Sequence, residues 1–146
     1  MIITPEYLAK SGTEDGEQAA LFCHAGMVAR GQWRADCPAD YRWGMLYAIP
    51  NGGKRSPATA ARMKATGVKE GFPDIGLPVA RGGFHSLFIE LKKAKVAGKR
   101  GQKIGGGTVA SEQETWHIKL RNEGFCVEVC YGWIEAAQTI ESYLNL

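Results

Sequence analysis

The sequence lacks a long apolar run, and it has no strong excess of charge of either sign. Its 146 residues carry 18 Lys and Arg against 15 Asp and Glu, a net charge of +3. The longest uncharged apolar stretch, residues 19–29, contains His24 and is far shorter than a membrane span. The chain does not open with a basic stretch followed by an apolar run, so we expect no export signal. These absences argue against a membrane protein and a purely electrostatic DNA coat, and they predict a cytoplasmic protein.

Paired cysteine motifs of the kind found in zinc sites are also missing. The four cysteines are Cys23, Cys37, Cys126 and Cys130, and no CxxC pair occurs among them. In a cytoplasmic protein we expect them to be reduced thiols. Cys126 and Cys130 are four residues apart in an apolar run, which is more typical of buried structural thiols than of metal ligands.

Glycine, by contrast, is abundant, with 19 residues, and 45% of the chain is apolar. This apolar fraction is sufficient for a packed core, and the length fits one domain spanning residues 1–146. The glycines predict many tight turns or a long flexible loop. Five of them fall in residues 93–110, where we expect such a loop.

Hydrophobic periodicity predicts alternating helices and strands. We expect helices over residues 14–30, 59–66, 111–123 and 133–144, and strands over residues 46–49, 75–79, 84–92 and 125–131. Ser111 and Glu114 match the S-x-x-E capping box, which predicts Ser111 as the helix cap. This order of elements indicates an α/β fold, with a mixed β-sheet flanked by α-helices.

The strand over residues 84–92 carries the chemistry of interest. Leu87, Ile89 and Leu91 alternate along it and can face the core. Glu90 and Lys92 then share the opposite face. A carboxylate and an ammonium group at the end of an otherwise apolar strand require an explanation.

A second carboxylate, Asp74, begins the preceding strand. If the two strands pair as a hairpin, Asp74 lies near Glu90, and two carboxylates with Lys92 form a site suited to Mg²⁺ or Mn²⁺. This chemistry fits phosphodiester hydrolysis, in which Lys92 orients the attacking water or neutralises charge on the phosphate. The alternative is a surface ion pair between Glu90 and Lys92, with Asp74 capping a turn.

The motif Pro73-Asp74 followed by Glu90-Leu91-Lys92 resembles the PD-(D/E)xK nuclease superfamily. Its surroundings resemble the VRR-NUC branch, in the stand-alone form of phages and bacteria, from about residue 14 to the C-terminus. The further segments that carry this resemblance are Pro50-Asn51-Gly52-Gly53 with Arg55, residues 67–75, residues 87–92, Ser111-Glu112-Gln113 and residues 120–125.

The resemblance implies a restriction-endonuclease-like core and a divalent-metal-dependent DNA endonuclease. For stand-alone members it further implies selectivity for branched DNA such as four-way (Holliday) junctions. A homodimer is expected because a symmetric junction needs two cuts related by a two-fold axis. The alternatives are a non-catalytic DNA-binding module of the same fold and a nuclease without junction preference.

The resemblance also implies further site residues. The family's first helix supplies an acid followed four residues later by Gln, a spacing that Glu14 and Gln18 match. Glu17 is a rival for this metal-binding role, because it falls on nearly the same helical face. Gln113 matches the family's Gln after the long loop, and we expect it to contact the phosphate or the attacking water.

Positive charge gathers beside these residues. Residues 92–111 hold six bases and no acid, whereas residues 1–30 hold four acids against two bases. A glycine-rich basic loop can follow a phosphate backbone without reading sequence. The residues predicted to contact DNA are Asn51, Lys54, Arg55, Lys93, Lys95, Lys99, Arg100 and Lys103.

Overall fold

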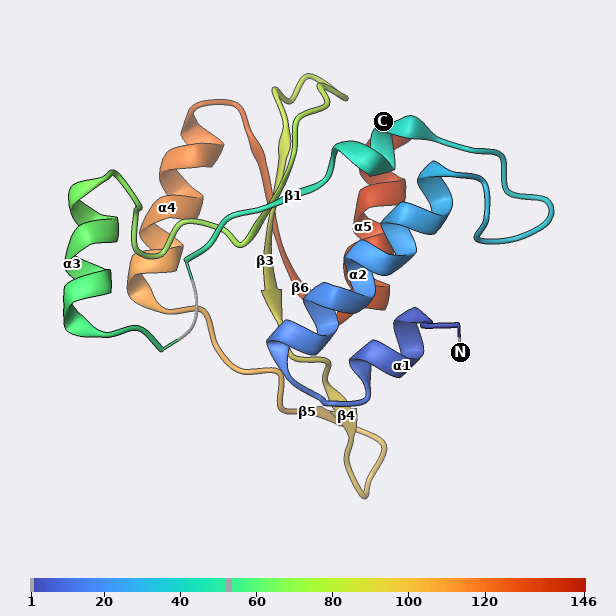
Figure 1. Ribbon diagram of the computed structural model, residues 1–146, viewed down its shortest axis with the longest axis horizontal. Helices are drawn as coiled ribbons and strands as arrows, with labels where there is room; N and C mark the ends of the chain where they lie inside the picture. The colour runs from blue at the N-terminus through green and yellow to red at the C-terminus, as the bar shows by residue number, and fades with distance from the viewer. Residues whose placement is uncertain (1, 52–53) are drawn as a thin grey trace.

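A four-stranded sheet forms the centre of the fold in the computed structural model, which describes residues 2–51 and 54–146 (Figure 1). The sheet order is β1-β2-β3-β6. β2 pairs antiparallel with both β1 and β3, whereas β6 pairs parallel with β3. The bounds are Tyr47–Ala48 for β1, Ile75–Leu77 for β2, Leu87–Lys92 for β3 and Cys126–Tyr131 for β6.

Helices cover both faces of this sheet. The remaining elements are α1 (Pro5–Ala9), α2 (Glu14–Ala29), the 3₁₀ helix η1 (Tyr41–Met45), α3 (Pro57–Ala65), β4 (Val96–Ala97), β5 (Lys103–Ile104), α4 (Ser111–Asn122) and α5 (Trp133–Leu144). Antiparallel β4 and β5 form a separate two-stranded hairpin. The prediction of a mixed sheet flanked by helices is therefore confirmed. Within the described ranges, no helix has the length and apolar character needed to cross a membrane.

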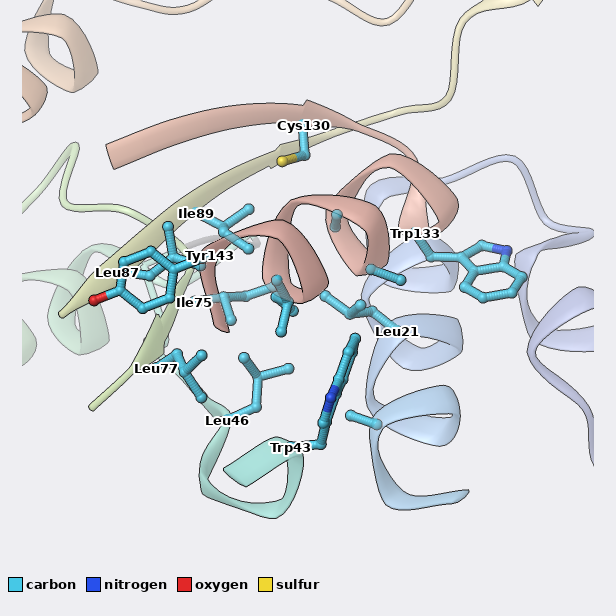
Figure 2. Close-up of a cluster of buried hydrophobic side chains, with 14 of the residues drawn as sticks. Leu21, Trp43, Leu46, Ile75, Leu77, Leu87, Ile89, Cys130, Trp133 and Tyr143 are labelled. Carbon is cyan, nitrogen blue, oxygen red and sulfur yellow. The ribbon is translucent and has the colours of Figure 1, made fainter. Parts of the chain in front are cut away.

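The larger hydrophobic core lies between one face of the sheet and the helices α2 and α5 (Figure 2). Leu87, Ile89 and Leu91 of β3 point into it, as their alternation predicts. Leu21 of α2 and Ile140 of α5 are fully buried there. Burial on this face fixes the register of β3, because a shift by one residue would bring its polar face into the core.

The smaller core lies on the opposite face, under α4. Phe88 of β3, Val127 of β6 and Leu120 of α4 are buried there. Phe72 packs edge-on against Phe88 and Trp116, with ring centroids 5.3 and 5.0 Å apart. β3 is thus buried on both faces, so its polar residues lie inside the protein.

Several predicted boundaries agree with the structure. Helix α5 spans the predicted residues 133–144, and α2 ends one residue before the predicted end. Residues 93–110 were predicted to form one long flexible loop, and this is wrong in part, because β4 and β5 lie within the segment. Their two-residue strands are too short to show a hydrophobic period.

The predicted cap of α4 is also wrong. The N-cap is Ala110, and Ser111 is the first helical residue. The side chain of Gln113, at the third helical position, accepts a hydrogen bond from the Ala110 N–H at 2.9 Å. The Ser111 hydroxyl instead lies 3.1 Å from Glu112 Oε2 and donates to it. Gln113 therefore takes the capping role.

The cysteines partly match their prediction. All four are free thiols in the described parts of the chain. Cys130 is buried as predicted, but Cys126 is only half-buried. Burial raises the pKa of each of these two thiols to about 11. Both therefore stay protonated at neutral pH, which disfavours metal binding through thiolates.

Candidate active site

The turn before β2 places Asp74 by packing against α4. Gly71 has a φ of +81°, and a Cβ there would lie 2.8 Å from the carbonyl carbon of Glu112. Only glycine combines this conformation with such a close approach. The indole Nε1 of Trp116 also donates to the Glu70 carbonyl oxygen at 3.0 Å. The turn is thus held to α4 just ahead of Asp74.

Asn51 supports the same turn from the other side. Its Nδ2 donates to the carbonyl oxygen of Phe72 at 2.8 Å, and its Oδ1 is buried without a hydrogen-bond partner among the described residues. The backbone N–H of Ile49 donates to the Asp74 carbonyl oxygen at 2.7 Å. Asn51 was predicted to contact DNA, and in this structure its amide holds the backbone beside Asp74. Its neighbours Gly52 and Gly53 lie outside the described residues.

Strand pairing brings Asp74 to Glu90. Ile75 pairs with Ile89 in these antiparallel strands. Asp74, which precedes Ile75, therefore lies opposite Glu90, which follows Ile89. The side-chain Oδ2 of Asp74 accepts a hydrogen bond from the backbone N–H of Leu91 at 2.9 Å. The hairpin predicted for these strands is therefore present, with both carboxylates at its open end.

Glu90 is buried beside this second carboxylate. Its side chain is 1% exposed. Burial first, and then the negative charge of Asp74, raise the pKa of Glu90 to about 8, while nearby Lys92 opposes the shift. The Oε2 atom of Glu90 makes no hydrogen bond within the described part of the chain. A cation between the two carboxylates would relieve both the repulsion and the burial penalty.

Gln113 joins Glu90 to Lys92. Its Nε2 donates to Glu90 Oε1 at 2.5 Å, and its Oε1 accepts from the Lys92 ammonium at 3.1 Å. Lys92 Nζ also lies 3.5 Å from Glu90 Oε1. The structure therefore brings together four of the predicted site residues: Asp74, Glu90, Lys92 and Gln113.

His117 completes this cluster and was not among the predicted site residues. It is 3% exposed, and its Nε2 lies 3.5 Å from Glu90 Oε2. Burial is the main cause that lowers its pKa, and the positive charges of Arg121 and Lys92 act in the same direction. The sequence did hold a signal for His117, because it lies one helical turn after Gln113 and therefore on the same face of α4.

The structure separates the two rival carboxylates of α2. Glu17 is buried, and its Oε2 accepts a hydrogen bond from the backbone N–H of Trp133 at 2.8 Å. The adjacent Gly132 N–H donates to the Lys92 carbonyl oxygen at 2.9 Å. The first turn of α2 thus lies beside the end of β3, but Glu17 is already engaged with the start of α5.

Glu14 is exposed on the same turn. Gln18, one turn later, lines a shallow hollow of about 430 Å³ with Asp15 and Ala48. Ala48 pairs with Ile75, the residue that follows Asp74. The face of α2 that carries Gln18 is therefore turned toward the part of the sheet next to Asp74. In the described ranges, however, no hydrogen bond or ion pair joins Glu14 to Asp74 or Glu90.

Most of the predicted DNA-contacting bases are on the surface. The exposed ones are Lys54, Lys93, Lys95, Lys99, Arg100 and Lys103. The ammonium group of Lys95 lies 3.8 Å from the ring centroid of Tyr131, at the end of β6. Arg55 is half-buried, and its guanidinium donates to the Pro50 carbonyl oxygen at 2.6 Å. The bases of the β4–β5 hairpin and its flanks therefore project from the end of β3 that carries Lys92.

The two carboxylates fit a hard divalent cation. The described residues contain no group of three or more His, Cys, Asp or Glu side chains arranged to hold a metal. Mg²⁺ is commonly held by one or two carboxylates, with water and substrate phosphate completing its shell. Asp74 and Glu90 provide that donor set, and the unpartnered Oε2 of Glu90 shows that its binding capacity is not used up.

A cavity larger than the hollow beside Gln18 lies elsewhere. Its volume is about 680 Å³, and it is lined by residues of α2, α5 and the segment 31–43. Three indoles, those of Trp33, Trp43 and Trp133, surround the buried His24 there, with ring centroids 4.3 to 5.5 Å from the imidazole. None of the predicted site residues lines this cavity. The carboxylate cluster instead lies at the C-terminal end of β3, beside the exposed basic hairpin.

Comparison with known proteins finds a solved structure with a similar overall fold. A protein described as a "VRR_NUC domain protein" superposes with a TM-score of 0.65 at 27% sequence identity. The match covers 92% of this chain and 89% of that chain. This likeness supports the assignment of the chain to the VRR-NUC family.

The overall fold agrees with this likeness. The mixed sheet flanked by helices matches the VRR-NUC nuclease fold. The assignment supports a nuclease-type function that acts on DNA. No protein-family model and no curated protein matches the chain.

Proposed function

We propose that the chain is a divalent-metal-dependent endodeoxyribonuclease that works as a single domain and hydrolyses phosphodiester bonds at the Asp74–Glu90 pair. The observation that carries this proposal is a buried carboxylate, Glu90, whose pKa is raised to about 8 beside a second carboxylate. Such a pair is poorly stable with both groups ionised unless a cation lies between them. VRR-NUC nucleases generally depend on a divalent metal.

Asp74 and Glu90 would hold Mg²⁺ or Mn²⁺. When bound, the ion supplies Lewis-acid chemistry toward the scissile phosphate. Asp74 is oriented for this role because its Oδ2 is fixed by the Leu91 N–H. Glu90 is oriented by the amide of Gln113. Glu14, exposed at the start of α2, is proposed as a third carboxylate toward the metal.

Lys92 is proposed to act on the phosphate or the attacking water. Its side chain is 9% exposed, and its ammonium is held by Gln113 Oε1 at 3.1 Å. A positive charge fixed in a largely dry site stabilises developing negative charge more than one in water. Gln113 therefore sets the position of both Glu90 and Lys92.

We further propose that the substrate is branched DNA, such as a four-way junction, and that the protein acts as a homodimer. The support is the resemblance to stand-alone VRR-NUC nucleases, together with the symmetry of a junction that needs two related cuts. The bases Lys93, Lys95, Lys99, Arg100 and Lys103, near the end of β3, would bind the phosphate backbone without reading sequence.

The activity is tested by incubating the protein with Mg²⁺ and labelled DNA. We expect Asp74→Ala and Lys92→Ala to reduce cleavage by at least 100-fold, of the order found when an electrostatic catalytic group is removed. Asp36→Ala and Lys10→Ala are matched controls, since both residues are exposed and lie outside the cluster. Full activity in either site variant would overturn the proposed site.

The substrate is tested with a four-way junction, a linear duplex and a flap of equal length. We expect faster cleavage of the junction, and a mass in solution that corresponds to two chains. Equal cleavage of all three substrates would contradict the junction preference. Salt-sensitive DNA binding without metal-dependent cleavage would instead support a non-catalytic module.

A further inference from the structure

Two buried polar atoms face one another beside the carboxylate pair. Nε2 of His117 and Oε2 of Glu90 are 3.5 Å apart, and neither makes a hydrogen bond to another group in the described part of the chain. Their side chains are 3% and 1% exposed. A buried donor or acceptor without a partner destabilises a protein, so two such atoms at this separation require an explanation.

We propose that His117 is a positioning residue, whose Nε2–H donates to Glu90 Oε2 and orients this carboxylate toward the metal. The inference rests on the proposed metal-binding role of Glu90. Hydrogen bonds of catalytic groups are often long before substrate binds, and they shorten in the substrate complex. The separation of 3.5 Å is short enough for such a contact to form through a small rotation of either side chain.

A second residue of α4, Gln113, also orients Glu90. Gln113 precedes His117 by one turn on the same face and donates to the other oxygen, Glu90 Oε1, at 2.5 Å. One rigid helix thus presents two donors to the two oxygens of a single carboxylate. Two contacts fix the rotation of the carboxylate plane, which one contact alone would leave free.

Packing alone does not account for an imidazole at this position. An apolar side chain of similar size would fill the same space without burying an unpartnered nitrogen. The groups around the imidazole are charged, because Lys92, Arg121, Glu114 and Asp74 all influence its electrostatic environment. In metal sites, groups that orient a ligand in this way typically change metal affinity or activity 10- to 100-fold when removed.

Two substitutions at position 117 test whether the N–H donor or the ring is required. His117→Phe keeps a planar ring of similar size and removes the N–H, whereas His117→Gln keeps an N–H and removes the ring. Ile118→Ala, at the exposed neighbouring position of α4, is the control. The measurement is the dissociation constant of Mn²⁺ for the purified full chain without DNA, by calorimetry or by electron paramagnetic resonance, and folding is checked by circular dichroism.

We expect His117→Phe to weaken Mn²⁺ binding by about 10- to 100-fold, and His117→Gln to retain an affinity at least several-fold higher than His117→Phe. If His117→Phe binds Mn²⁺ as well as or better than His117→Gln, then His117 affects metal binding through packing and not through its N–H, and the inference is overturned. Failure of the wild-type protein to bind Mn²⁺ would overturn the proposed function and this inference together. Mn²⁺ binding by the wild type that is insensitive to position 117 overturns the inference alone.

Discussion

At position 90 a carboxyl group is buried, and its neighbours oppose its ionisation. The side chain of Glu90 is 1% exposed, and its pKa is raised to about 8 by burial and by Asp74. In the metal-free protein it is therefore mostly protonated at pH 7. The unfolded chain would ionise this residue near the ordinary glutamate pKa of 4.5.

This difference predicts how stability depends on pH. Between pH 4.5 and 8 the folded state binds more protons at Glu90 than the unfolded state, so the free energy of unfolding falls as pH rises. His24 and His117 have lowered pKa values and give the opposite slope only below about pH 6.5. Between pH 6.5 and 8, the difference between the wild type and Glu90→Gln isolates the contribution of Glu90, because both proteins share the same histidines and thiols.

We expect metal-free stability to fall by at most about 1.4 kcal/mol per pH unit across that window. Glu90→Gln should remove the part of the slope that Glu90 contributes, because an amide does not titrate and can still accept from Gln113. Urea unfolding in the presence of a chelator measures the effect, and added Mg²⁺ should restore stability at pH 8. The same slope in wild type and Glu90→Gln would contradict a titrating Glu90.

The central motif could be predicted from the sequence because its geometry is local. The alternation along β3 puts Glu90 and Lys92 on one face, and the antiparallel pairing of β2 with β3 brings Asp74 beside them. The contact of His117 with Glu90 was missed because it joins a helix to a strand 27 residues away. Helical spacing alone showed that His117 follows Gln113, but not what this face of α4 covers.

At the scale of elements, a side chain from α2 caps the start of α5. Helix α5 has Gly132 at its N-cap, without a side chain of its own to accept hydrogen bonds. Glu17 Oε2 fills this role for the Trp133 N–H. A carboxylate at a helix N-terminus is favoured by both the hydrogen bond and the helix dipole.

Substitutions on α2 should therefore separate stability from catalysis. Glu17→Ala leaves a buried N–H of α5 without a partner, so we expect a loss of about 1–3 kcal/mol in the free energy of unfolding. Glu14→Ala at the exposed position should change stability by less than about 0.5 kcal/mol and reduce metal-dependent cleavage. Denaturant titration and a cleavage assay at low temperature, where both variants are folded, measure the two effects. Loss of cleavage in Glu17→Ala with unchanged stability would reverse the assignment.

The predicted N-cap of α4 was wrong because a tertiary contact outweighs a local sequence pattern. The S-x-x-E pattern at Ser111 satisfies a local rule, but the helix begins one residue earlier than that rule requires. Gln113 then binds the Ala110 N–H, Lys92 and Glu90 at once. Contacts with the sheet fix the position of Gln113, and this outweighs the local preference of a serine cap.

Across the whole molecule, charge is segregated rather than balanced. The net charge of +3 combines an acidic first 30 residues with six bases in residues 92–111. Most of the latter are exposed on the β4–β5 hairpin and its flanks. A second basic surface lies on α3, where Arg62 and Lys64 are exposed.

The salt dependence of DNA binding tests this distribution. In metal-free buffer, the double substitution Lys99→Ala with Arg100→Ala should lower the slope of log affinity against log salt by about 2, if each base binds one duplex phosphate. Lys10→Ala with Arg30→Ala removes the same charge from the N-terminal region and should leave the slope nearly unchanged. Equal effects of the two pairs would show that net charge, and not the hairpin, drives binding.

The sequence by itself determined the α/β class, the core face of β3 and the grouping of Asp74, Glu90 and Lys92, because these follow from short-range periodicity and turn chemistry. It also carried the family resemblance. Only the tertiary structure decided that Glu17 caps α5, that Asn51 braces the turn before Asp74, and that His117 faces Glu90. Each of these contacts joins residues distant along the chain, and it forms only when helices pack on both faces of one sheet.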